Sequence, residues 1–282
     1  MANKLFYYNQ NDYGTVQYNK PNGEKATVKS GGCGVCSACI VFNTLAQKEL
    51  YSVKAMAKLS QECGARTNNG TDESTLLKTL CADNKGFSFK TTSDLKELKK
   101  HLKGGGMAIA NQGNAYNVFS TAGHYVVAYR LIDGNIDVVD PQMYSGKYDK
   151  APRPERIVSK TAYGCIVKPS QLKKATADRC PSYYLVTYDK PSNKPHVVVG
   201  DVVKLTNPNV LYLKANKDAY FKVCDLTPFK CEERAQLKKG SKVTVFAVDT
   251  VKGNVWIKTK VSGIECYIIA YDKKKDKSYI KA

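Results

Sequence analysis

A β-hairpin signal between residues 124 and 140 constrains the fold of this chain more than any other local pattern. Two runs rich in β-branched residues, 124–129 and 136–140, flank the tripeptide Asp133-Gly134-Asn135. Asp-Gly between such runs predicts a tight turn that joins antiparallel strands. His124 begins the first run and Asp140 ends the second. The start of one strand lies beside the end of the next, so the two side chains are predicted to be neighbours across the ladder.

A cysteine between glycines is the second informative feature. Cys33 stands in Gly32-Cys33-Gly34, just ahead of an apolar run at helical spacing from Ser37 to Leu50. Glycines permit a tight entry turn, and the free N–H groups at the start of a helix favour negative charge nearby. Such surroundings stabilise a thiolate, the nucleophilic form of cysteine. Cys33 is therefore a candidate nucleophile.

Together, these three side chains supply the roles that a cysteine hydrolase needs. Asp140 would orient the ring of His124, and the imidazole would deprotonate the thiol of Cys33. Of the three histidines, His101 lies in the lysine-rich end of a predicted helix and His196 lies in a predicted linker. This leaves His124 as the candidate base. The spacing of these residues alone does not predict that the hairpin packs against Cys33.

The same cysteines allow two other kinds of chemistry. Cys33 and Cys36 have the spacing of a thioredoxin-like redox pair, and with Cys39 they could begin a metal or iron–sulfur site. The segment before Cys33 is polar, however, rather than a buried strand, and no fourth ligand stands at a matching spacing. We therefore expect no metal and no cofactor. Ten cysteines without a clustered pattern agree with a reducing compartment.

Four short motifs lie within residues 5–188: Tyr8-Asn9-Gln10-Asn11-Asp12-Tyr13-Gly14, Gly32-Cys33-Gly34, Gly123-His124-Tyr125-Val126-Val127 and Val139-Asp140-Pro141. In this order they resemble the papain-like cysteine peptidases related to bacteriocin-leader peptidases, family 39 of the cysteine peptidases. The resemblance implies that Cys33 is the nucleophile, His124 the general base and Asp140 the residue that orients His124. It also implies that the Gln10 side chain donates to the oxyanion hole beside the backbone N–H of Cys33. Gln17 is a rival for this last role.

The chain departs from that family's pattern at two points. Val35 and Cys36 stand where the family usually has Pro-Thr, and Val139 stands where it often has Asn. Neither change removes a catalytic atom. The first leaves a second thiol beside Cys33.

The pattern changes after residue 188. Residues 189–196 contain two prolines and small polar residues, which predicts an extended linker. Short β runs separated by turn signals then predict a small all-β barrel over residues 197–282. The six predicted strands are 197–205, 210–213, 221–223, 242–248, 255–260 and 265–269.

This last part is similar to bacterial SH3 domains that bind cell walls. The similarity is carried by Leu211-Tyr212-Leu213, Leu237-Lys238-Lys239-Gly240-Ser241-Lys242-Val243-Thr244-Val245 and Val255-Trp256-Ile257-Lys258. The Asn and Arg that the family has in its early strand are missing. Trp256, the one tryptophan, is either a ligand-binding platform or a core residue, and the sequence leaves both open.

The formal charge of +19 has to be explained by a partner or a surface. Lys and Arg exceed Asp and Glu both before and after residue 196, so the whole chain attracts polyanions such as nucleic acid, anionic lipid or a teichoic-acid-bearing wall. No zinc-finger, recognition-helix or aromatic-stacking signature supports a nucleic-acid partner. No apolar run is long enough to span a bilayer, and the first residues form no secretory signal. We therefore expect synthesis in the cytoplasm and no membrane partner.

These observations predict an α+β protein, with helices first and an antiparallel sheet second. A papain-like peptidase domain is expected over 1–188, a linker over 189–196 and an SH3-like domain over 197–282. The predicted function is that of an endolysin-like peptidoglycan hydrolase that cleaves an amide bond of the wall peptide and has the bacterial cell wall as its partner. Two alternatives stay open: a cysteine peptidase acting on a protein or leader peptide, and a non-catalytic wall or polyanion binder.

Overall fold

The computed structural model describes residues 4–189, 195–207, 209–211, 236–261 and 263–281. The chain divides into two compact units, Met1–Lys190 and Pro191–Ala282. No helix of the described residues is long and apolar enough to cross a membrane.

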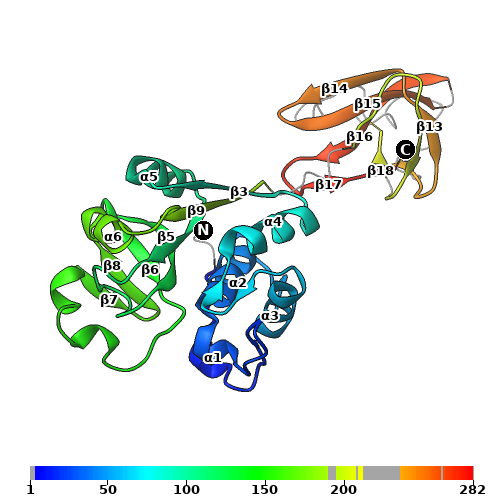
Figure 1. Ribbon diagram of the computed structural model, residues 1–282. Helices are drawn as coiled ribbons and strands as arrows, with labels where there is room; N and C mark the ends of the chain where they lie inside the picture. The colour runs from blue at the N-terminus through cyan, green and yellow to red at the C-terminus, as the bar shows by residue number, and fades with distance from the viewer. Residues whose placement is uncertain (1–3, 190–194, 208, 212–235, 262, 282) are drawn as a thin grey trace. The chain divides into compact units, whose positions relative to one another are not determined.

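The first unit is built on a seven-stranded sheet in the order β3-β9-β4-β5-β6-β8-β7, in which every neighbouring pair is antiparallel (Figure 1). The strands are β3 (Phe87–Thr92), β4 (Met107–Gln112), β5 (His124–Ile132), β6 (Asn135–Val139), β7 (Ser159–Thr161), β8 (Gly164–Val167) and β9 (Tyr183–Tyr188). Strands β4, β5 and β6 lie in the middle of the sheet, so side chains at their ends rest on a rigid support.

The helices of the first unit pack against the sheet or against one another. They are α1 (Val28–Gly31), α2 (Cys33–Ala46), α3 (Val53–Glu62), α4 (Glu73–Asp83), α5 (Leu95–Lys103) and α6 (Pro169–Ala175). Short elements complete the unit: η1 (Gln10–Asp12), η2 (Lys147–Asp149), η3 (Pro154–Arg156), β1 (Arg66–Thr67) and β2 (Gly70–Thr71).

Alternating residues of the central strands pack into two separate hydrophobic cores. Val127 of β5 belongs to the core that also contains Ile40 of α2. Its neighbour Val126 belongs to a second core, together with Leu98 of α5 and Leu172 of α6. Successive side chains of a strand point to opposite faces, so helices lie on both faces of the sheet. This arrangement places the start of α2 near the start of β5.

The predicted hairpin is confirmed. Strands β5 and β6 pair in antiparallel register, and both turn residues, Asp133 and Gly134, have left-handed backbone conformations, with φ of 49° and 78°. Two such residues form the turn whose twist matches that of paired strands. Val127 pairs with Val139, which places Asp140 opposite Val126 and makes its contact with His124 diagonal across the ladder.

The helix that carries Cys33 begins earlier than predicted. Helix α2 starts at Cys33 rather than at Ser37 and ends at Ala46, where Gln47 adopts a left-handed conformation. Residues Arg66–Thr67 form strand β1, which pairs with β2. At the start of helix α3, the Ser52 side chain accepts a hydrogen bond from the Ala55 N–H.

The second unit is all-β in its described residues. Its strands are β10 (Val202–Leu205), β11 (Asn209–Val210), β12 (Gln236–Leu237), β13 (Lys242–Thr244), β14 (Ala247–Val251), β15 (Asn254–Val261), β16 (Ile264–Asp272), β17 (Lys277–Ser278) and β18 (Ile280–Lys281). They form three sheets, β13-β10-β18, β11-β12 and β14-β15-β16-β17.

No closed barrel is found in the part of residues 195–281 that the structure describes, so the predicted barrel is not confirmed. The predicted strand at 221–223 and the segment 190–194 of the predicted linker lie outside the described residues. Trp256 lies on β15 and is fully buried, which favours the core alternative over a ligand platform.

Candidate active site

Cys33 is the first residue of α2, with Gly32 as the N-cap. The glycines on either side are required by packing rather than by backbone angle. A Cβ on Gly32 would lie 2.7 Å from the Val28 carbonyl oxygen, and one on Gly34 would lie 2.6 Å from the Glu73 Oε2. Side chains at both positions would collide with their neighbours, so the glycines let the nucleophile's turn pack closely.

Several groups favour the thiolate form of Cys33. Burial opposes ionisation, but a hydrogen bond from His124 and the positive charge of its ring hold the pKa of the Cys33 thiol below its ordinary value. Hydrogen bonds from the backbone N–H groups of Tyr125 and Gly34 act in the same direction. Because a helix start also favours negative charge, Cys33 lies in an environment suited to a nucleophile.

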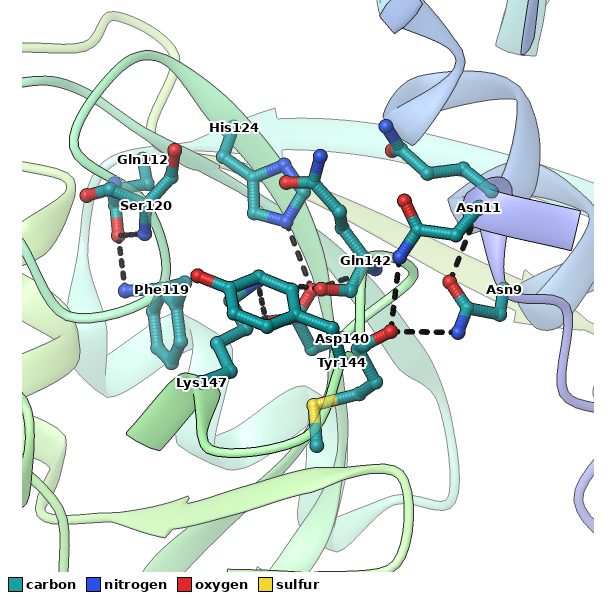
Figure 2. Close-up of polar contacts among 12 residues, drawn as sticks. Asn9, Asn11, Gln112, Phe119, Ser120, His124, Asp140, Gln142, Tyr144 and Lys147 are labelled. Atoms are coloured by element: carbon teal, nitrogen blue, oxygen red, sulfur yellow. Dashed lines mark hydrogen bonds and ion pairs between the residues drawn. The ribbon is translucent and has the colours of Figure 1, made fainter. Parts of the chain in front are cut away.

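His124 and Asp140 form the hydrogen bond that the hairpin predicts. The Nε2 of His124 donates to the Oδ1 of Asp140 at 2.9 Å (Figure 2). Both side chains are buried. Burial lowers the pKa of His124, but the charge and hydrogen bond of Asp140, with smaller effects of Cys33, outweigh it and raise the pKa to about 9. The ring is therefore charged at neutral pH, and together with the lowered pKa of Cys33 this favours a thiolate–imidazolium pair.

His124 is not the sole partner of the Asp140 carboxylate among the described residues. Its Oδ2 lies 2.6 Å from the Nζ of Lys147 and accepts a 2.6 Å hydrogen bond from the Tyr148 hydroxyl. The backbone N–H of Gln142 donates to Oδ1 at 2.8 Å. Burial alone would raise the pKa of Asp140, but the positive charges and hydrogen bonds of His124 and Lys147 hold it far below its ordinary value. The carboxylate thus stays ionised.

The chain ahead of His124 is fixed by Gln112. This buried side chain accepts a 2.7 Å hydrogen bond from the Phe119 N–H (Figure 2). It also donates to the carbonyl oxygens of Ser120 and Ala122. Gln112 also pairs with His124 across strands β4 and β5. The loop before the base is therefore anchored from inside.

Gln10 is buried beside the nucleophile's turn but does not line the cleft. Its Nε2 donates to the Lys29 carbonyl at 3.0 Å, and its backbone N–H donates to the Pro141 carbonyl at 2.6 Å. Its Oε1 is buried and finds no hydrogen-bond partner within the described residues. Gln17, the rival, is exposed and forms an isolated β-bridge with Thr27. The oxyanion role of Gln10 stays a prediction.

A cleft of about 440 Å³ opens above Cys33 and His124. The β1–β2 hairpin contributes Thr67, Asn69 and Thr71 to its walls, and Arg179 comes from the segment between α6 and β9. Most of the lining is polar. The cleft leaves the Cys33 side chain accessible to polar molecules from solvent.

The other cysteines near the site are packed in the core. Cys36 and Cys39 are fully buried, and burial raises the pKa of each thiol well above its ordinary value. Both are therefore neutral, apolar packing residues rather than nucleophiles. In the described part of the chain, no group of three or more His, Cys, Asp or Glu side chains is placed to hold a metal ion.

Sequence reasoning missed Lys147, Tyr148, Gln112 and Arg179. Lys147 and Tyr148 lie in an irregular stretch after Asp140, where no periodicity indicates which side chains turn inward. The one available signal is a lysine and a tyrosine shortly after a candidate catalytic aspartate, and it is weak. Their roles follow from tertiary contacts.

No protein-family model matches the chain, and no curated protein matches it. Among solved structures, one described as a C39-like peptidase from Bacillus anthracis is 14% identical, with 66% of this chain and 96% of that chain covered and a TM-score of 0.41. The crystal structure of Ly7917 and that of Ly7917 with the hydrolysing product of MDP are each 14% identical, with TM-scores of 0.20. They cover 70% of this chain and 66% and 67% of their own. With identities and scores this low, the function has to be inferred from the site itself.

Proposed function

We propose that the first unit is a thiol hydrolase that cleaves amide bonds, with Cys33 as nucleophile, His124 as acid and base, and Asp140 as the residue that orients His124. The observation that carries this proposal is the buried relay from Asp140 through His124 to Cys33 at the floor of a polar cleft. Nucleophile, base and orienting carboxylate within hydrogen-bonding reach are the signature of covalent catalysis.

The reaction proceeds in two halves. The Cys33 thiolate attacks the amide carbonyl carbon, and the oxygen takes the negative charge, which the backbone N–H of Cys33 at the helix start is positioned to stabilise. The His124 imidazolium then gives its proton to the leaving nitrogen as the C–N bond breaks, leaving a thioester on Cys33. Water, deprotonated by His124, attacks the thioester, releases the acid and restores the ion pair.

We further propose bacterial peptidoglycan as the substrate. Its cross-linked peptides supply amide bonds flanked by polar groups, which suit the polar cleft. The formal charge of +19 favours association with anionic wall polymers. Because the substrate is an immobile polymer, an enzyme that stays attached gains from a high effective concentration.

The second unit is proposed to supply this attachment through a row of lysines. Lys204 of β10 pairs with Lys242 of β13 on one side and with Lys281 of β18 on the other. All three are exposed, and no ion pair with an acidic side chain is found for them among the described residues. Directly opposed like charges destabilise a sheet, so their alignment on one face favours an anionic ligand.

The proposal is tested by measuring new amino groups released from purified Gram-positive peptidoglycan. Wild type and Cys36→Ala should release amines, whereas Cys33→Ala should release none yet remain bound to the wall. Cys36→Ala is the matched control because it removes a neighbouring thiol that the mechanism does not use. Cleavage of a soluble protein with no release from walls would support the peptidase alternative. Wall binding without cleavage by any of the three proteins would support the non-catalytic alternative.

A further inference from the structure

The active-site cleft contains one cationic side chain with no assigned role. Arg179 lines the same cavity as Cys33 and His124. No Asp or Glu is found among the described residues that line this cavity. Arg179 therefore adds a positive charge to the cleft that no carboxylate of the described lining neutralises.

The backbone that carries Arg179 is firmly held. The Ser182 hydroxyl lies 2.9 Å from the Arg179 carbonyl oxygen and 3.0 Å from that of Thr176. The Arg179 N–H donates to the same Thr176 carbonyl at 3.2 Å. Arg179 thus projects from an anchored turn, so the backbone that carries it loses little conformational entropy on binding a ligand.

The guanidinium lies against the residue that precedes the general base. A Cβ on Gly123 would stand 2.9 Å from a terminal nitrogen of Arg179. Gly123 therefore leaves the space that the guanidinium occupies, one residue from His124. This places the charge beside the position where a scissile amide would lie.

The guanidinium is also under-satisfied by the protein. Its Nε is buried and finds no hydrogen-bond partner among the described residues, and no ion pair of Arg179 is found among them. The adjacent Asp178 forms no ion pair with Arg179 among the described residues, and its carboxylate accepts a 3.2 Å hydrogen bond from the Asn114 N–H. A buried donor without a partner costs free energy, which a ligand carrying an acceptor would recover.

We propose that Arg179 is the specificity-determining residue of the cleft and selects peptides that carry a free carboxylate beside the scissile amide. A guanidinium matches a carboxylate with two parallel N–H donors, which gives both charge and geometric selection. This inference rests on the proposed hydrolase function and names the chemistry of its substrate. Wall peptides offer such groups at an isoglutamate α-carboxylate and at their C-terminus.

The test measures binding rather than turnover. Calorimetry on Cys33→Ala would compare the tetrapeptide L-Ala-D-isoGlu-L-Lys-D-Ala with two analogues, in which each of its two carboxylates is amidated in turn. One of the amidations should weaken binding roughly 10- to 100-fold, the effect of losing a charge-assisted pair. In Cys33→Ala/Arg179→Gln the same amidation should change the affinity less than twofold.

Arg130→Gln in the Cys33→Ala background is the matched control. Arg130 lies on β5 and pairs with Asp137 at 3.0 Å, and its side chain is half exposed. The Arg130→Gln variant should keep the full difference in affinity between the tetrapeptide and its amidated analogue. If Arg179→Gln lowers the melting temperature, Arg179→Lys replaces it and should retain part of the discrimination, because a lysine keeps the charge but loses the paired donors.

Affinities that do not respond to amidation, or a discrimination that survives Arg179→Gln, would overturn the inference. The same holds if none of the three peptides binds. The outcome is separable from that of the wall assay. Arg179-dependent selection without amine release would support the inference and contradict peptidoglycan as the substrate. Amine release with peptide affinities that do not depend on the carboxylates would support the substrate and contradict the inference.

Discussion

The Nζ of Lys147 lies 2.6 Å from the Oδ2 of Asp140, and the two side chains are almost completely buried. Asp140 therefore has two cationic partners, because its other oxygen accepts from His124. In the proposed mechanism His124 loses and regains its proton during turnover, whereas Lys147 takes no part in the proton transfer. Lys147 thus holds Asp140 ionised when the histidine is neutral, so the orienting group is available in both halves of the reaction.

Lys147→Met should destabilise the first unit by about 3 kcal/mol, since removing one partner of a buried ion pair leaves the other poorly compensated. Lys160→Met is the matched control: Lys160 and Asp149 also lie 2.6 Å apart, but both are more than half exposed. Its cost should be below about 1 kcal/mol. Urea unfolding measures both. Equal costs for the two variants would contradict the role given to burial.

Asp140→Asn should lower kcat/KM by roughly 10²- to 10⁴-fold, in the range measured for orienting aspartates of catalytic triads. The amide keeps the size of the side chain but loses the charge that raises the pKa of His124. Steady-state kinetics on the wall substrate would measure the loss, with Asp137→Asn, on the strand β6 that precedes Asp140, as the control. Near-normal activity of Asp140→Asn would show that Asp140 does not orient the base.

Activity should fall as pH rises through about 9, where His124 loses the proton that the leaving amine requires. The stability that protonated His124 contributes through its pairing with Asp140 should also fall as pH rises. A histidine whose pKa is raised on folding stabilises fully below its unfolded value of about 6.5 and loses that contribution as pH rises through about 9. Initial rates and melting temperatures between pH 6 and 10 check both. A flat activity profile above pH 8 would contradict this assignment.

Gly34→Ala should destabilise the first unit by about 1–3 kcal/mol, the usual cost of overpacking a well-packed site. The added Cβ would lie 2.6 Å from the Glu73 Oε2 and 2.8 Å from the Thr71 Cβ. Gly31→Ala is the matched control, because its Cβ would meet only the Arg66 guanidinium, at an ordinary 3.5 Å. Thermal unfolding should separate the two variants, and similar melting temperatures would contradict the packing account.

Local patterns in the sequence predict the β5–β6 hairpin and hence the meeting of His124 with Asp140, because turn chemistry and strand alternation act over a few residues. The start of α2 is predicted too late, because glycines at positions 32 and 34 weaken the helical pattern. Tertiary packing, which determines that α2 begins at Cys33, leaves no local signal.

The same reason explains what sequence analysis misses at the site. Lys147 and Arg179 reach Asp140 and the cleft from irregular segments, so their partners are fixed by long-range contacts. In the second unit, alternation predicts strands well but not how they join. The described strands form three sheets, and the expected barrel is not confirmed.

The most direct test of the central claim is the rate at which iodoacetamide alkylates individual cysteines at pH 6, followed by mass spectrometry. Cys180 is an internal reference, because it is exposed and free. Cys33 should react much faster than Cys180 in the wild type, since its thiolate is paired with His124, and should lose this advantage in His124→Ala. A Cys33 no more reactive than Cys180, or unaffected by His124→Ala, would contradict the thiolate–imidazolium pair.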